Sequence, residues 1–146
     1  MPLDVASANA AVQATGTVSG VFLFGWSWGG ALVNRLVTTG TRYQAAASWE
    51  GVADLRLLDE RVGGEPFRRS RWGTPTDNAD VWERASAISH ASAVRTPMLL
   101  LHGETGCPEQ GQAWQRALQR AGVPVELWIY PGGHLPAPDV VQLFQP

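Results

Sequence analysis

A serine between two glycines is the residue of this sequence best suited to nucleophilic chemistry. Ser27 lies in the run Gly25-Trp26-Ser27-Trp28-Gly29, after a short apolar segment and before a segment with helical spacing. A hydroxyl at the tip of a sharp strand-to-helix turn can attack an acyl carbon, and the next backbone N–H can stabilise the resulting oxyanion. We therefore expect Ser27 to be a nucleophile and Trp28 to supply an oxyanion N–H. Gly25 and Gly29 would remove Cβ atoms that clash in so tight a turn; the alternative is a turn with a structural role only.

A serine nucleophile needs a general base, and one of the three histidines is suited to that role. His134 comes directly after the last strand-like segment, and two glycines before it allow the backbone to aim its side chain. In α/β-hydrolases the chain order is nucleophile, acid and then histidine, on a loop after the last strand. We therefore expect His134 to accept the Ser27 proton. His102 is expected to be structural, and His90 to be exposed.

Alternating strand-like and helix-like segments must position these residues. Apolar runs predict strands at 18–24, 43–49, 98–102 and 123–130, and helical spacing predicts helices at 3–14, 31–37, 54–61 and 108–121. Strand, helix and strand joined by short links indicate parallel pairing. Weak periodicity over residues 51–95 predicts an irregular region that shapes the substrate pocket. The tail at 138–144 is long enough only for a short helix.

Composition bounds the class of protein. The chain has 146 residues, of which 45% are hydrophobic, and a net charge of −2. We therefore expect one domain over 1–146, without nucleic acid or a membrane as partner. The N-terminus shows no basic segment followed by an apolar one, so we expect no signal peptide and a cytoplasmic protein. A single cysteine excludes an intrachain disulfide.

Five blocks of the chain together resemble the prolyl oligopeptidase-type family of serine hydrolases, particularly its acylaminoacyl- and dipeptidyl-peptidase branch. They are residues 25–30, 49–55, 72–75, 97–104 and 123–134. The resemblance implies an α/β-hydrolase fold, a Ser-Asp-His triad, and cleavage of short peptides or small acyl esters with no metal or cofactor. Within it, Ser27 matches the nucleophile, Trp28 the oxyanion amide and His134 the base.

The chain departs from this family at the acid of the triad. Gly106 stands where the family has its aspartate. Glu104 and Glu109 are possible substitutes because glutamate reaches further, but we favour surface roles for both. Asp54 and Asp139 are weaker candidates. Without an acid, a triad enzyme slows by about 10⁴.

The chain is also shorter than the family's hydrolase domain. The family places further strands before the serine, and the loop after one of them supplies the second oxyanion N–H. We therefore expect a truncated α/β-hydrolase, with a mostly parallel sheet flanked by helices and without the family's N-terminal strands. Its serine-bearing strand would have an open edge, which soluble proteins avoid. A second copy or a partner chain is expected to cover that edge.

Two functions of different class follow. The first is a serine hydrolase, peptidase or esterase, that forms an acyl-enzyme at Ser27 and binds an apolar group near Trp26, Trp28 and Trp49. The second is a catalytically impaired hydrolase-fold fragment that acts as a binding or assembly module. A Cys107 nucleophile is a weaker third idea, because no histidine is evidently paired with it.

Overall fold

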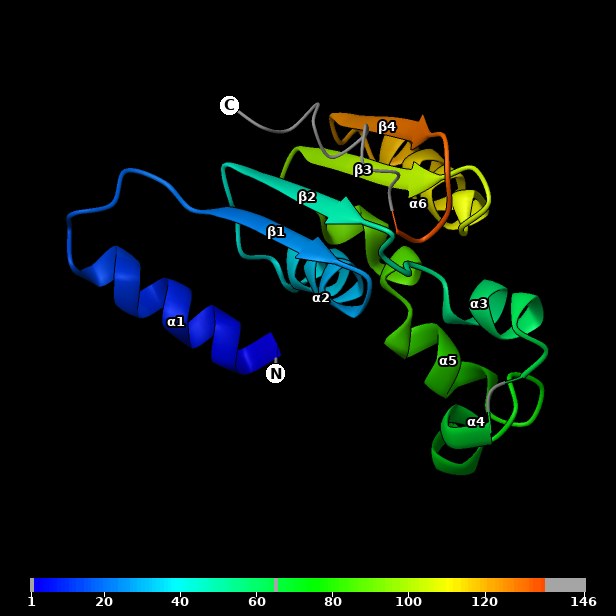
Figure 1. The fold of residues 1–146 in the computed structure, drawn as a ribbon. Coiled ribbons are helices and arrows are strands. Elements are labelled where there is room, and N and C mark those ends of the chain that lie inside the picture. Colours follow the sequence, from blue (N-terminus) through cyan, green and yellow to red (C-terminus); the bar gives the residue numbers. More distant parts are fainter. Residues whose placement is uncertain (1, 65, 136–146) are drawn as a thin grey trace.

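The central feature of the fold is a four-stranded parallel sheet (Figure 1). The computed structural model describes residues 2–64 and 66–135. In these ranges β1 pairs with β2, β2 with β3 and β3 with β4, all in parallel. The strands are β1 (Phe22–Trp26), β2 (Ala45–Trp49), β3 (Met98–Gly103) and β4 (Val125–Tyr130). The parallel sheet with flanking helices confirms the predicted fold class.

Two helices cover one face of this sheet. α2 (Trp28–Leu36), extended by the 3₁₀ turn η1 (Val37–Thr39), leads from β1 to β2, and α6 (Pro108–Arg120) leads from β3 to β4. Their apolar sides meet the same set of sheet residues and form one core. The core includes Val33 and Val37 from α2, Ala46 and Leu100 from the sheet, and Trp114 and Leu118 from α6. α1 (Pro2–Ala14) lies outside this core and beside α2 (Figure 1).

The prediction of an irregular region over 51–95 is wrong in part. Besides the expected α3 (Leu55–Arg61), it contains α4 (Pro66–Trp72), α5 (Ala79–Ala85) and the 3₁₀ segment η2 (Ala87–Ala93). α4 and α5 have only seven residues each, too few to show a helical period in the sequence. Tertiary packing stabilises them, since the Trp82 side chain is fully buried against the edge of Trp72.

The other predicted elements differ from the structure mainly at their ends. The first strand begins at Phe22 rather than at residue 18, because its pairing with β2 starts there. The helix expected at 31–37 begins earlier, at Trp28, directly after the serine. The helix expected at 138–144 lies outside the described residues.

The second face of the sheet and the outer edge of β1 are apolar and accessible. In the described chain β1 pairs with β2 only, and Phe22 and Phe24 are 69% and 68% exposed. These side chains, with Leu99 and Trp128, line a shallow apolar hollow on this face. The expectation that a second copy or another chain covers the edge stays a prediction. No helix within the described ranges is long and apolar enough to cross a membrane.

Candidate active site at the carboxyl ends of the strands

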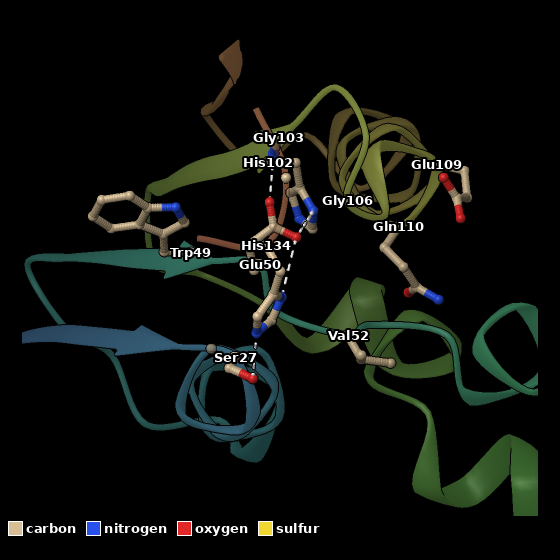
Figure 2. Close-up of polar contacts among 12 residues, drawn as sticks. Ser27, Trp49, Glu50, Val52, His102, Gly103, Gly106, Glu109, Gln110 and His134 are labelled. Carbon is tan, nitrogen blue, oxygen red and sulfur yellow. Dashed lines mark hydrogen bonds and ion pairs between the residues drawn. The ribbon is translucent and has the colours of Figure 1, made fainter. Parts of the chain in front are cut away.

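Three side chains capable of acyl-transfer chemistry meet where the parallel strands end (Figure 2). Ser27 follows β1, Glu50 follows β2, and His134 lies on the loop after β4. Backbone hydrogen bonds continue beyond the strands: the Ser27 N–H donates to the Trp49 carbonyl at 2.8 Å, and the Glu50 N–H donates to Leu101 at 2.8 Å. Because the strands are parallel, residues distant in sequence come together at one edge.

Ser27 occupies a strained turn between β1 and α2. Its φ is 58° and its ψ is −121°, a backbone conformation that non-glycine residues rarely adopt. The turn is tight enough that a Cβ on Gly25 would fall on the Gly29 carbonyl, which supports the steric role expected of Gly25. The same role is wrong for Gly29, where an added Cβ would meet no atom within 4 Å.

At the start of α2, the position that requires glycine for close packing is Gly30, which was not singled out from the sequence. A Cβ there would lie 2.8 Å from the Gly51 Cα and 2.8 Å from the Trp49 carbonyl oxygen. The start of α2 therefore packs directly against the backbone of the chain after β2. Glu50 belongs to that segment of the chain.

The Trp28 amide lies at the start of α2. Trp28 is the first residue of this helix, so its N–H has no partner within the helix. The amide follows Ser27 directly and shares in the positive end of the helix dipole. These features fit an oxyanion donor, a role that stays a prediction.

His134 is directed at the serine. Its Nε2 lies 3.0 Å from the Ser27 Oγ, a hydrogen-bond distance. Trp26 holds it from β1: the indole Nε1 donates to the His134 carbonyl at 3.2 Å, and the two rings lie 5.2 Å apart. The structure thus brings together the two residues that the sequence analysis paired, although they are separated by more than one hundred positions.

Glu50 is the carboxylate nearest the other side of this imidazole. Its Oε2 lies 3.6 Å from His134 Nδ1, while its side chain is only 1% exposed. Its Oε1 accepts hydrogen bonds from the Gly103 N–H and, at 3.0 Å, from the Tyr130 hydroxyl. Glu50 is not among the acids expected from the sequence. One feature of the sequence could have indicated it. Glu50 comes directly after a buried strand, and a buried charge requires polar or charged partners.

His102 faces the same carboxylate from the end of β3. Its Nδ1 lies 3.8 Å from the Glu50 Oε2. Burial lowers the pKa of His102 below its usual value, although the nearby Glu50 opposes the shift. Burial and the bond to Glu50 also act on Tyr130, whose pKa is raised to about 12. Tyr130 therefore keeps its proton at neutral pH.

Of the predicted acids that lie within the described residues, the structure brings none to His134. Glu104 is exposed in the turn after β3, Glu109 pairs with Arg61 at 3.3 Å, and the Asp54 carboxylate caps α3. Asp139 lies outside the described residues. Glu104 and Glu109 thus lie where the favoured surface roles place them, and the possible role of Glu104 as the acid is not supported; the buried carboxylate near His134 is that of Glu50.

A hollow opens beside the serine. Its lining includes Ser27, Trp28, Val52, Leu58, Arg68 and His134. Of the three tryptophans expected near a substrate, only Trp28 lines it; the Trp49 indole instead donates to the Tyr130 hydroxyl at 2.8 Å. Across residues 2–64 and 66–135, no three His, Cys, Asp or Glu side chains are grouped to hold a metal ion.

A family profile and a sequence relative both match most of this chain. The sequence profile of the prolyl oligopeptidase family matches residues 3–137. An uncharacterized peptidase of Bacillus subtilis, YuxL, is 31% identical over 121 residues, which cover 73% of this chain and 17% of the relative.

Solved structures of peptidases share the fold. Porphyromonas gingivalis dipeptidyl peptidase 4 aligns with a TM-score of 0.79 at 24% identity, covering 91% of this chain and 19% of that one. A Mycobacterium tuberculosis puromycin-hydrolyzing peptidase aligns with a TM-score of 0.74 at 25% identity, covering 90% of this chain and 21% of that one. Pyrococcus horikoshii acylaminoacyl peptidase gives 0.69 at 23% identity, covering 79% and 20%. The chain therefore spans about a fifth of the length of the proteins that it matches.

Proposed function

Because this chain belongs to the prolyl oligopeptidase family of serine peptidase-type hydrolases, we propose that it hydrolyses acyl bonds with Ser27 as nucleophile and His134 as general base. The observation that carries the proposal is the 3.0 Å distance between the Ser27 Oγ and the His134 Nε2, at a serine held in a strained turn. A serine with a purely structural role has no need of an imidazole at this distance.

In the proposed reaction, the Ser27 Oγ attacks the acyl carbon while His134 Nε2 accepts the hydroxyl proton. The bond to the leaving amine or alcohol then breaks as His134 returns that proton to it, and an acyl-Ser27 ester remains. Water attacks this ester, His134 accepts the proton of the water, and the acid product leaves as the Ser27 hydroxyl is restored. The Trp28 N–H would stabilise the oxyanion that forms in acylation and again in deacylation.

The proposed substrates are short peptides or small acyl derivatives. They are suggested by the peptidase activities named for the proteins of similar fold: dipeptidyl, acylaminoacyl and puromycin-hydrolyzing. Peptide and ester hydrolysis share one site, so the hollow beside Ser27 serves either. Trp28 offers an aromatic surface there.

The second candidate function is a hydrolase-fold module that binds or assembles but does not turn over. The accessible aromatic edge of β1 favours it. Turnover alone separates the two candidates poorly, because an impaired oxyanion hole slows a hydrolase by about 10²- to 10³-fold. A slow enzyme and an inert module must therefore be separated by an assay that does not depend on turnover.

Reaction with a fluorophosphonate, followed by intact-mass spectrometry, is that assay. We expect one adduct on the wild-type chain and none on Ser27→Ala, because only an activated serine attacks the phosphorus. Ser19→Ala, which removes an exposed serine, is the matched control and should label fully. A folded wild-type chain that forms no adduct would reject the enzyme and leave the binding module.

A further inference from the structure

We infer that Glu50 is the carboxylate that positions His134. Because residue 106 is glycine, the space that the Glu50 carboxylate occupies is free, and the acid can come from the end of β2 instead of from the turn after β3. The inference rests on the proposed function for its meaning in catalysis. Its structural content, a carboxylate that determines which imidazole nitrogen carries the proton, can be tested without activity.

A side chain at position 106 would displace the Glu50 carboxylate. A Cβ on Gly106 would lie 2.7 Å from the Glu50 Oε2 and 3.0 Å from its Oε1. An aspartate in the turn after β3 would need the volume that the Glu50 carboxylate occupies. Figure 2 shows the Gly106 backbone beside the carboxylate and His134 on its other side. The glycine at position 106 and the position of the Glu50 carboxylate are thus linked: the one leaves the space that the other fills.

The Glu50 carboxylate is anchored through one of its two oxygens. One oxygen, Oε1, is held by the Gly103 N–H and the Tyr130 hydroxyl, and this leaves Oε2 to face the histidines. Tyr130 keeps its proton at neutral pH, so this anchor persists. A carboxylate that is buried and fixed by two donors is pre-organised to orient a neighbouring group.

Two histidines lie near the Glu50 carboxylate, and only one of them gains a proton in the proposed reaction. His102 and His134 lie at similar distances, 3.8 Å and 3.6 Å. His102 is buried, and burial favours its neutral form. His134 is half-exposed and gains a proton during the proposed reaction, so it is the ring that benefits from a nearby negative charge. At 3.6 Å the contact is longer than a hydrogen bond, and catalytic hydrogen bonds that are long in the free enzyme often tighten when substrate binds.

Glu50→Gln is the first test. The amide keeps an oxygen that can accept from Gly103 and Tyr130, but it removes the charge beside His134. We expect the rate of fluorophosphonate labelling to fall by about 10² to 10⁴, the upper value being that of the equivalent amide substitution in a serine protease triad. Glu104→Gln and Glu109→Gln, the carboxylates considered from the sequence, should label at the wild-type rate. Wild-type labelling by Glu50→Gln would overturn the inference.

Relocation of the carboxylate is the sharper test. Glu50→Ala vacates the space, and Glu50→Ala combined with Gly106→Asp places an acid in the turn after β3. We expect the double variant to label at least about tenfold faster than Glu50→Ala alone, and Gly106→Asp alone to label poorly because of its clash with Glu50. A double variant no faster than Glu50→Ala, with both folded by circular dichroism, contradicts the inference.

A readout independent of activity separates this inference from the proposed function. The imidazole ¹⁵N shifts of His134, observed through its carbon-bound protons, report which nitrogen carries the proton. With Glu50 opposite Nδ1, we expect the Nδ1–H form in the wild type and a changed population in Glu50→Gln; His134→Gln assigns the signals. Equal populations in the two proteins refute the role of Glu50, whereas a wild type with the expected form but no adduct refutes only the hydrolase.

Discussion

Gly29 and Gly30 are neighbours in the first turn of α2, yet the structure predicts opposite responses to an added methyl group. Gly29→Ala introduces a Cβ that meets no atom within 4 Å. Neither glycine has a positive φ, so alanine is compatible with the backbone at both positions. Alanine in a helix is more stable than glycine by up to about 1 kcal/mol. We therefore expect Gly29→Ala to raise the free energy of unfolding by between about 0 and 1 kcal/mol.

Gly30→Ala gains the same helix propensity but creates a backbone clash. Its Cβ would lie 2.8 Å from both the Gly51 Cα and the Trp49 carbonyl oxygen, and neither backbone atom can rotate away. Inserting a methyl group into so tight a contact costs about 1 to 3 kcal/mol. Because both variants gain the same propensity, the clash alone separates them, and we expect Gly30→Ala to be less stable than Gly29→Ala by about 1 to 3 kcal/mol.

Urea unfolding followed by tryptophan fluorescence measures both changes on one scale. Gly30→Ala should also label more slowly with a fluorophosphonate, because displacing α2 from the chain after β2 separates Ser27 from Glu50. Gly29→Ala is its matched control, one residue away in the same helix. If both substitutions lower stability equally, the geometry derived for the start of α2 is incorrect.

Three further outcomes are expected. Trp26→Phe keeps an aromatic ring on His134 but loses the donor to its carbonyl, a bond worth about 0.5 to 1.5 kcal/mol; labelling should therefore slow by about 2- to 12-fold, and an unchanged rate would exclude a role for that bond. Because burial holds the pKa of His102 below 6.5, the unfolded chain binds more protons below that pH; the free energy of unfolding should fall on acidification by at most about 1.4 kcal/mol per pH unit from this group, and His102→Gln should reduce the slope measured by urea titrations. Burial raises the pKa of the Cys107 thiol, so iodoacetamide at neutral pH should alkylate it more slowly in the native chain than in urea; equal rates would contradict its burial.

Local patterns in the sequence were sufficient for much of the scaffold. Ser27 between glycines, after an apolar run and before a helix, predicts the strand–turn–helix that the structure contains. The continuous apolar run before His102 predicts a strand buried on both faces; β3 is an interior strand and most of its residues are buried, but Leu99 lines the accessible hollow on the second face. His134 could be paired with Ser27 because chain order and a loop after the last strand are one-dimensional properties. Family resemblance added the fold that connects them.

Only the tertiary structure revealed which carboxylate stands behind the histidine and which glycine the turn requires. The surroundings of Glu50 come from Gly103, Tyr130 and His134, residues more than fifty positions away that parallel pairing brings to one edge. In the sequence, Gly106 indicates that the expected acid is missing. In the structure, its lack of a side chain leaves the space that the Glu50 carboxylate fills. The need for glycine at position 30 likewise depends on the approach of Gly51, which lies in the chain after β2. Residue types and periodicity describe what one segment can do, but steric exclusion and the anchoring of a buried charge depend on neighbours that only the folded chain supplies.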